Sequence, residues 1–351
     1  MRGEWCAMDE RVAEILEGEA AWVVGGAVRD RLLGRPVVDL DVACDDPRAA
    51  AHRFARRFGG AAFPLSEQHG AWRVATAGSE ETVDFTPLSD GIDADLATRD
   101  FTLNAIALPL AGGAPRDPHG GRADIDARIL RAVSDTAFRD DPIRLLRAVR
   151  LEDELGFRMD ERTEALVRES ASAVMQPAGE RILGELSRLS AAGYGRLEEV
   201  GLLGPLGGSL EGPLAAVDDA RFRLVVVFRK RLSELPISRE LRRYADVLMH
   251  ARRPDDDSAR SIHRFRRHTE PWALHALAYV GASDLVEAVE ESRRADPHEP
   301  LVRGNELGLP PGPEIGRILA LIEEERAAGT ISTRDEALAL ARAHSAGATS
   351  S

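Results

Sequence analysis

Residues 22–34 read Trp-Val-Val-Gly-Gly-Ala-Val-Arg-Asp-Arg-Leu-Leu-Gly, and residues 37–43 follow as Val-Val-Asp-Leu-Asp-Val-Ala. The first run predicts a strand that turns sharply into a helix at Gly25 and Gly26, because glycine lacks the Cβ that restricts such a turn. Backbone N–H groups at the start of that helix favour a phosphate. Arg29 follows one helical turn later and adds a positive charge.

The second run carries two acidic residues on one strand. Side chains alternate along a strand, so Asp39 and Asp41 point to the same side while Leu40 turns into the core. Neighbouring carboxylates repel each other unless cations lie between them, and Mg²⁺ binds to a few carboxylates together with substrate oxygens. By itself Asp-x-Asp also occurs on solvated strand edges. Together with the glycine pair and Arg29, it predicts a metal site for phosphoryl transfer.

Composition limits the remaining classes. The chain has 351 residues, 44% of them hydrophobic, which is typical of a folded protein of two or three domains. Its two cysteines, Cys6 and Cys44, lie in no Cys/His cluster, which argues against a zinc site or a disulfide framework and favours the cytoplasm. The longest apolar stretches fall short of the roughly 20 residues that span a bilayer, so we expect no membrane segment. Neither GxxxxGK[ST] nor GxGxxG occurs, which disfavours a P-loop and dinucleotide binding.

The pattern of apolar residues changes along the chain. Short apolar runs of strand length lie at residues 21–24, 37–42, 72–76 and 82–86. Helical periodicity is found at residues 141–154, 161–174, 180–191, 239–251, 271–280 and 314–328. We therefore expect an α+β protein with a small mixed-sheet head over 1–124. All-helical parts should follow, namely a neck over 125–200, a body and tail over 201–345, and a frayed end at 346–351.

Three further blocks carry polar residues in dense patterns. Residues 95–105 read Asp-Leu-Ala-Thr-Arg-Asp-Phe-Thr-Leu-Asn-Ala, residues 138–150 read Phe-Arg-Asp-Asp-Pro-Ile-Arg-Leu-Leu-Arg-Ala-Val-Arg, and residues 180–186 read Glu-Arg-Ile-Leu-Gly-Glu-Leu. With the first two runs and a glycine- and proline-rich run at 303–316, they resemble the tRNA nucleotidyltransferase and poly(A) polymerase family. The likeness is to its bacterial-type CCA-adding class, which has a polymerase-β-like nucleotidyltransferase head. Thr98 stands where the family has a first arginine.

The resemblance implies roles for particular residues. Asp39 and Asp41 would be catalytic and hold the metals, with Mg²⁺ as cofactor. The nucleotide-binding residues would be Gly25, Gly26, Arg29, Arg99, Asp100, Asn104, Asp141, Arg144, Arg147 and Arg150. Within this set, Asp141 and Arg144 would read the Watson–Crick edge of the base, one accepting and one donating. The 180–186 block would support the neck, with no catalytic residue assigned there.

Structural alternatives remain open for two blocks. Asp100 with Thr102 could simply begin a helix. Asp141 could be an N-cap before Pro142, with the arginines of the stripe paired to nearby glutamates. On a helix that stripe presents one basic face, which needs an anionic partner.

The function implied is metal-dependent attack of the 3′-OH of tRNA on the α-phosphate of ATP or CTP, adding CCA or A only. A poly(A) polymerase and an inactive RNA-binding homologue are the alternatives. The span from Asp84 to Arg99 is shorter than we expect for the CCA-adding enzymes that the chain resembles, which carry there a flexible loop for switching between C and A. The resemblance therefore favours addition of A alone. Asp84 itself is a candidate third metal ligand. No His-Asp pair occurs, so we expect no HD phosphohydrolase activity.

One window reverses the acidic character of the chain. The net charge is −13, yet residues 221–270 hold 14 Arg and Lys against 7 Asp and Glu, a local net of +7. Such a contrast is typical of a polyanion site, although solvated helix faces with Arg/Glu pairs have the same composition. If the chain binds tRNA, this window is the candidate surface for its phosphates.

Overall fold

The computed structural model describes residues 7–66, 70–76, 81–88, 90–297 and 299–345. Contacts divide the chain into two compact units, Met1–Leu206 and Gly207–Ser351. The expected division of the first unit at residue 124 stays a prediction, and the expected frayed end at 346–351 lies outside the described residues. Each unit is treated by itself below.

A six-stranded mixed sheet forms the centre of the head, in the order β3-β4-β5-β2-β1-β6. Its strands are β1 (Ala21–Val24), β2 (Asp39–Cys44), β3 (Ala61–Ser66), β4 (Ala71–Ala75), β5 (Thr82–Pro87) and β6 (Ala107–Pro109). β2 pairs with β5 in parallel, while the other neighbouring pairs are antiparallel. The four expected strands are confirmed within two residues. β3, which contains a proline, and the three-residue β6 were not expected, because neither shows a clear period of two.

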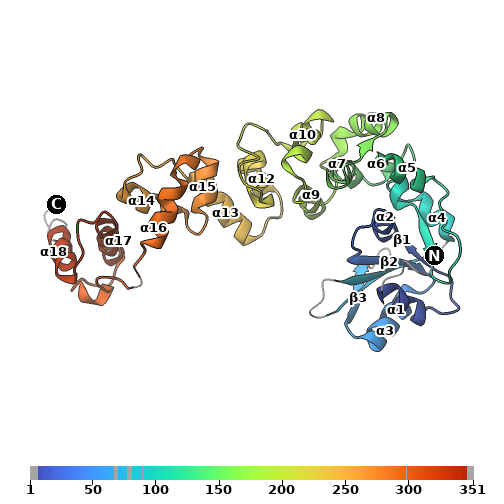
Figure 1. Ribbon diagram of the computed structural model, residues 1–351, viewed down its shortest axis with the longest axis horizontal. Coiled ribbons are helices and arrows are strands. Elements are labelled where there is room, and N and C mark those ends of the chain that lie inside the picture. Colours follow the sequence, from blue (N-terminus) through green and yellow to red (C-terminus); the bar gives the residue numbers. More distant parts are fainter. Residues whose placement is uncertain (1–6, 67–69, 77–80, 89, 298, 346–351) are drawn as a thin grey trace. The chain divides into compact units, whose positions relative to one another are not determined.

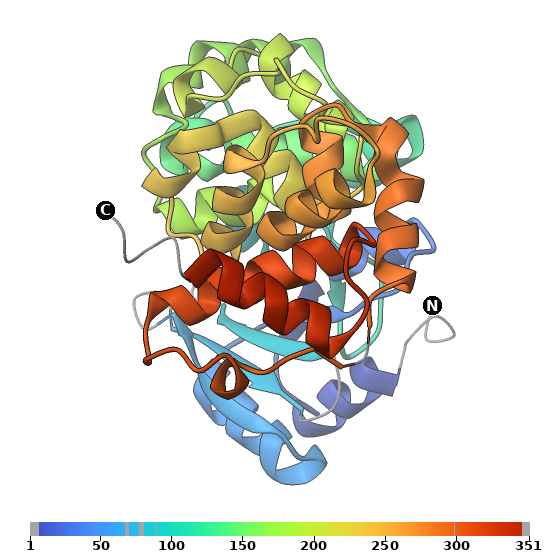
Figure 2. The ribbon, with the colours of Figure 1, turned by 90° about the vertical axis from the view of Figure 1, so that its left-hand side faces the viewer.

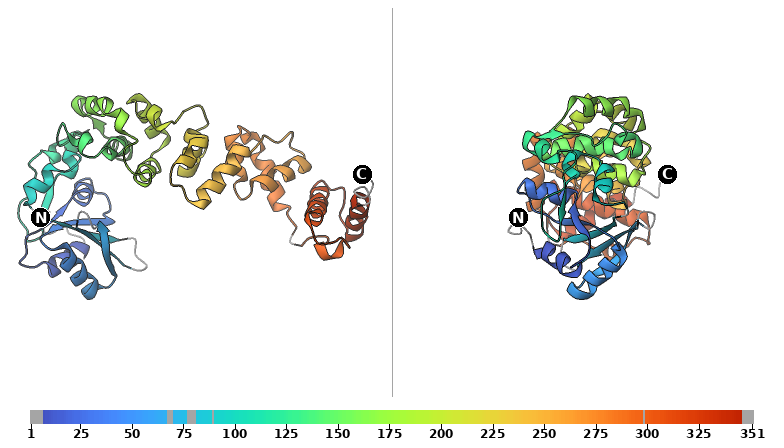
Figure 3. Two further views of the ribbon diagram at one scale, coloured as in Figure 1. Left: turned by 180° about the vertical axis from the view of Figure 1, so that it is seen from behind. Right: turned by 90° about the vertical axis from the view of Figure 1, so that its right-hand side faces the viewer.

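Helices cover both faces of this sheet. α1 (Ala7–Ile15) and α3 (Pro47–Phe58) lie on one face, and α2 (Gly26–Leu32) lies on the other (Figures 1 and 3). Leu40 is fully buried between its two acidic neighbours on β2, as the alternation of side chains requires. On the face that carries Asp41, a cluster built around Val24, Ala43 and Leu96 closes the core. The α+β fold class is confirmed.

Helices make up most of the rest of the first unit. They are α4 (Ile92–Ala97), η2 (Thr102–Asn104), α5 (Gly121–Ala127), α6 (Ala137–Asp140), α7 (Ile143–Leu155), α8 (Glu161–Glu169), η3 (Ala171–Ala173), α9 (Gly179–Leu186), α10 (Ala191–Glu199) and α11 (Leu203–Leu206). The expected helix over 180–191 ends early because Ser190 caps α10 through the N–H of Gly193. A short parallel ladder of β7 (Ile129–Leu130) and β8 (Arg158–Met159) interrupts the all-helical neck.

The second unit is helical throughout its described residues. Its helices are α12 (Ala220–Phe228), η4 (Arg229–Glu234), α13 (Arg239–His250), α14 (Ala259–Thr269), α15 (Ala273–Tyr279), η5 (Ser283–Leu285), α16 (Val286–Arg294), η6 (Gly304–Glu306), α17 (Pro313–Ala327) and α18 (Arg334–Ser345). α17 and α18 lie side by side at its end (Figure 2). None of the helices in the described parts of the chain combines the length and the apolar character of a membrane span.

Candidate active site

The turn between β1 and α2 brings three groups together. Gly25 has φ +70°, a conformation that side chains disfavour. A Cβ at this position would lie 3.1 Å from Oδ2 of Asp41 and 3.3 Å from Nη1 of Arg99. The Asp41 carboxylate and the Arg99 guanidinium therefore converge on the bare backbone of Gly25.

The acidic strand lies beside a third carboxylate. Asp39 and Asp41 stand on the same side of β2, and Asp41 pairs with Asp84 of the parallel strand β5. Thr82 donates a hydrogen bond of 2.6 Å to Asp39. Asp84 is buried and accepts two hydrogen bonds of 2.7 Å from Arg73 of β4, so its charge is already matched.

Asp41, by contrast, forms no ion pair within the described residues, although Arg99 lies near it. Burial raises the pKa of Asp41 to about 6; Arg99 partly opposes this, and the carboxylates of Asp84 and Asp39 add to it. A cation placed among these oxygens would relieve the repulsion, and carboxylate oxygens are the ligands that hard divalent cations prefer. The residues present therefore fit a divalent metal held by Asp39 and Asp41. Mg²⁺ is usually bound by one or two carboxylates together with substrate phosphate oxygens. Across the described part of the chain, no preformed cluster of three or more His, Cys, Asp or Glu side chains could hold a metal.

A chain of polar contacts leads from α2 towards the helical part of the unit. Arg29 donates to Oδ1 of Asn104 at 2.9 Å and forms an ion pair of 2.8 Å with Asp30. The side-chain amide of Asn104 in turn donates to Asp100 at 2.9 Å. Asp100 also accepts from the N–H of Phe101, whereas the short helix η2, which begins at Thr102, has no side-chain cap hydrogen bond.

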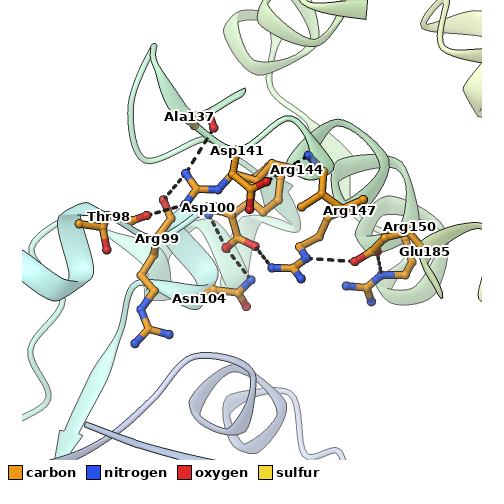
Figure 4. Close-up of polar contacts among 12 residues, drawn as sticks. Thr98, Arg99, Asp100, Asn104, Ala137, Asp141, Arg144, Arg147, Arg150 and Glu185 are labelled. Carbon is orange, nitrogen blue, oxygen red and sulfur yellow. Dashed lines mark hydrogen bonds and ion pairs between the residues drawn. The ribbon is translucent and has the colours of Figure 1, made fainter. Parts of the chain in front are cut away.

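These polar contacts continue through the arginine stripe of α7, Arg144, Arg147 and Arg150 (Figure 4). Arg147 pairs with Asp100 at 3.2 Å and with Glu185 of α9 at 3.3 Å. Glu185 also accepts from Arg150 at 2.5 Å, and Arg150 pairs with Glu154 as well. The anionic partners that the stripe requires thus include three carboxylates of the protein itself.

Asp100 is ionised within this network. Burial alone would raise its pKa, but the charge of Arg147 and the hydrogen bonds from Asn104 and the Phe101 N–H lower the pKa of Asp100 below its usual range. The Asp100 carboxylate therefore stays charged and links the short helix η2 to α7. Through Asn104 it also sets the position of Arg29.

The two expected base-reading residues lie at the beginning of α7 and are both engaged. Asp141 forms an ion pair of 2.7 Å with Arg181 of α9. Arg144 donates to three backbone carbonyls, those of Thr98, Arg99 and Ala137 (Figure 4). Arg99 itself pairs with Asp95 at 2.7 Å and extends away from the stripe.

Three residues of the site were not predicted. They are Arg73, which holds Asp84, and Arg181 and Glu185, which hold members of the α7 block. A signal was present for Glu185, because a stripe of three arginines needs acids and residues 180–186 supply two glutamates. The predicted pairing of the stripe with nearby glutamates is confirmed only for Arg150 with Glu154.

The mixed sheet, the glycine turn against the acidic strand and the arginine helix define a nucleotidyltransferase. Residues 21–131 match the family described as the poly A polymerase head domain. Over 91% of its length, the chain is 33% identical to the A-adding tRNA nucleotidyltransferase of Deinococcus radiodurans, of which it covers 94%. It is 34% identical to the CC-adding tRNA nucleotidyltransferase of Thermus thermophilus, with 91% of the chain and 92% of that relative covered. The chain therefore belongs to the tRNA nucleotidyltransferase family.

Two further matches cover part of the chain at higher identity, or the fold alone. The CC-adding tRNA nucleotidyltransferase of Geobacter sulfurreducens is 45% identical over 178 residues, which are 49% of this chain and 40% of that relative. A CCA-adding enzyme solved with ATP superimposes with a TM-score of 0.77 at 21% identity, covering 96% of this chain and 94% of that one. The latter likeness concerns the fold alone.

Proposed function

We propose that this enzyme adds nucleotides from ATP or CTP to the 3′ end of tRNA with Mg²⁺ as cofactor. The observation that carries the proposal is the convergence of Asp41, Arg99 and the bare backbone of Gly25 at one point of the head. A triphosphate at this turn would meet a cation, the carboxylates that hold its metals, and a backbone without a blocking Cβ. Relatives that span nearly the full chain are named for this activity.

The reaction needs little covalent work from the protein. The terminal 3′-OH attacks the α-phosphorus in line, a new P–O bond forms, the bond to the β-phosphate oxygen breaks, and pyrophosphate leaves. Asp39 and Asp41 would hold the divalent ions, which supply charge neutralisation for the attacking and leaving oxygens. Arg99 lies next to Asp41 and would bind the phosphates. Arg29, which lies beside Gly26 and donates to Asn104, would add a second positive charge at the turn.

Base selection is assigned to the beginning of α7. Adenine and cytosine carry an amino group where guanine and uracil carry a carbonyl, so a carboxylate acceptor such as Asp141 favours the first two. Arg144 would donate to the neighbouring ring nitrogen after releasing at least one of its carbonyl partners. Arg147 and Arg150, which are paired with Asp100, Glu185 and Glu154, hold α7 in place.

The nucleotides added form the finer part of the proposal. A short connection between Asp84 and Arg99 suits a single specificity, because it leaves little chain to rearrange between C and A. Addition of A alone remains our first candidate. Addition of CC is the second, favoured by the 45% identical CC-adding relative.

The test offers tRNA ending before CCA, after C and after CC, each with a single nucleotide, and reads product lengths. An A-adding enzyme should extend only the tRNA that ends after CC, and only with ATP. A CC-adding enzyme should extend only the tRNAs that end before CCA or after C, and only with CTP.

Asp39→Asn and Asp41→Asn should each lower the rate by at least about 10³-fold, the order expected when transition-state charge is left uncompensated. Failure of the folded wild-type enzyme to extend any of these RNAs would refute the proposal. An Asp84→Asn variant that is fully active at saturating Mg²⁺ would exclude Asp84 as a metal ligand.

The second unit is proposed to bind the tRNA. Much of the positive charge in residues 221–270 is matched by acids outside that window, as in the ion pairs of Arg264 with Glu324 and Arg253 with Asp284. Among the described residues of this window, an unpaired basic set remains exposed without an ion pair: Arg229, Lys230, Arg231, Arg239, Arg242, Arg243, Arg252 and Arg267. A cavity of about 620 Å³ between α13 and α14, lined by Arg252 and two histidines, His250 and His268, adjoins part of this set.

A cytoplasmic location is also proposed. The cysteines show no pattern of a disulfide framework, and two relatives named as tRNA nucleotidyltransferases each match 91% of the chain. Fractionation of the native host, with the enzyme traced by antibody, tests this location. Recovery in a membrane or exported fraction would contradict it.

A further inference from the structure

Asp141 is held by an arginine from a different helix. Its two carboxylate oxygens accept from the guanidinium of Arg181, Oδ2 at 2.7 Å and Oδ1 at 3.1 Å. Within the described residues, the carboxylate otherwise accepts a single hydrogen bond, from the N–H of Ile143 at 3.4 Å, which is long and weak. The fork of Arg181 therefore sets the orientation of the Asp141 carboxylate.

The pair is not required to dock α9 against α7. Glu185 already joins these helices through Arg147 and the buried Arg150. Arg188, just after α9, adds an ion pair with Glu154 at 2.7 Å. By contrast, the side chains of Arg181 and Asp141 are 51% and 30% exposed. Pairs so open to water contribute little to stability, so a structural role explains the Arg181 contact poorly.

Arg144 cannot take over this orienting role while it keeps its observed contacts. Its guanidinium donates to the carbonyls of Thr98, Arg99 and Ala137, the shortest bond being 2.6 Å to Thr98. Within the described residues, Arg181 is thus the cationic side chain that contacts Asp141. The carboxylate has about four lone-pair sites, and a two-pronged arginine uses two of them. Of the remaining two, one accepts the weak bond from the Ile143 N–H and the other stays available to an amino group of a base.

We infer that Arg181 is a positioning residue that fixes the Asp141 carboxylate for the amino group of an incoming adenine or cytosine. This inference rests on the proposed function. The two-pronged contact of Arg181 holds the Asp141 carboxylate in one orientation. Removing Arg181 should therefore weaken base discrimination more than it weakens nucleotide transfer.

The experiment compares Arg181→Ala with Arg188→Ala as the matched control. Both remove an exposed arginine that forms an ion pair, Arg181 with Asp141 just before α7 and Arg188 with Glu154 in the last turn of α7. For each variant, kcat/KM is measured with all four nucleoside triphosphates on the tRNA that the wild type extends. We expect Arg181→Ala to lower the preference for the cognate amino-bearing base over guanine and uracil by about tenfold, the worth of one oriented charge-assisted hydrogen bond. The base preference of Arg181→Lys should lie between those of the wild type and Arg181→Ala, because lysine keeps the positive charge but not the two-pronged geometry. Arg188→Ala should leave the preference unchanged.

A double-mutant cycle separates orientation from general damage. If Arg181 acts through Asp141, then Arg181→Ala should cause no further loss of discrimination in an Asp141→Ala enzyme. The inference is overturned if Arg181→Ala lowers kcat/KM by the same factor for all four nucleotides, or if the two effects add. Thermal unfolding of each variant verifies that it is folded.

Nucleotide binding without RNA distinguishes failure of the inference from failure of the proposed function. Calorimetric titration of ATP, CTP, GTP and UTP into wild type and Arg181→Ala reports base preference independently of transfer. A wild type that extends no RNA but loses its binding preference on Arg181→Ala would overturn the tRNA function and keep the inference. A wild type that extends tRNA, with the same preference in both proteins, would overturn the inference alone.

Discussion

At the scale of single residues, Asp41 carries the most telling property of the site. Its pKa is raised to about 6 because it is buried, with Asp84 and Asp39 adding to the effect against Arg99. The folded protein thus favours the neutral acid. In the metal-free protein, the raised pKa adds about 3 kcal/mol to the free energy of unfolding at low pH. This contribution is complete below about pH 4 and is lost as the pH rises through about 6.

This shift predicts competition between protons and metal. Divalent ions bind the ionised carboxylate, so saturating Mg²⁺ should raise the melting temperature more at about pH 7.5 than at about pH 5. Asp41→Asn should abolish most of the Mg²⁺ effect and its pH dependence. Asp126→Asn, at an exposed position of α5, should keep both. An equal Mg²⁺ effect at both pH values in the wild type would contradict the assignment; scanning calorimetry with and without chelator makes the measurement.

At the scale of elements, one glutamate joins α7 to α9. Glu185 is buried and accepts from both Arg147 and Arg150, and Arg150 is itself buried. Glu185→Ala leaves these cations undercompensated and should destabilise the protein by roughly 3 kcal/mol, the cost of breaking a buried pair. The midpoint of urea unfolding should fall accordingly.

The control for this change is Glu198→Ala on α10. Glu198 is exposed, and a substitution there should change stability by no more than about 0.5 kcal/mol. Because Arg147 also contacts Asp100, Glu185→Ala should in addition raise KM for the nucleotide. If both variants unfold at the same urea concentration, the network does not hold the two helices together.

At the scale of the whole molecule, chemistry and RNA affinity should be separable. The site lies within the first unit, and the unpaired basic set lies in the second. Arg239→Ala combined with Arg242→Ala removes two exposed cations of α13 and should weaken tRNA binding. The slope of log affinity against log salt should become shallower by about one per cation. The rate at saturating tRNA should be unchanged.

Arg294→Ala combined with Arg317→Ala is the charge-matched control. Both of these arginines are exposed but already paired, with Glu287 and Glu314 respectively. Filter binding across a range of salt concentrations compares the two double variants. Equal losses of affinity would show that only the net charge of the chain matters, and that the basic set is no specific surface.

Local sequence patterns were sufficient for much of the fold. β1 was predicted with its observed bounds, and β2, β4 and β5 within two residues, because strand alternation and glycine turns are short-range properties. The same alternation placed Asp39 and Asp41 on one side of β2. The length of the helices α8 and α9 was overestimated, because a capping serine and a 3₁₀ turn interrupt a continuous apolar period.

The sequence by itself determined the acidic pair on one strand, the sharp turn at Gly25 and the basic stripe of α7, since each depends on residues a few positions apart. Only the tertiary structure decided which charges meet. Arg73 reaches Asp84 across 11 positions, Arg181 reaches Asp141 across 40, and Asp100 meets Arg147 across 47. Such pairings depend on how strands and helices pack, and ion pairs between distant segments have no period along the chain. The acids and arginines were visible in the sequence, but their partners were set by the fold.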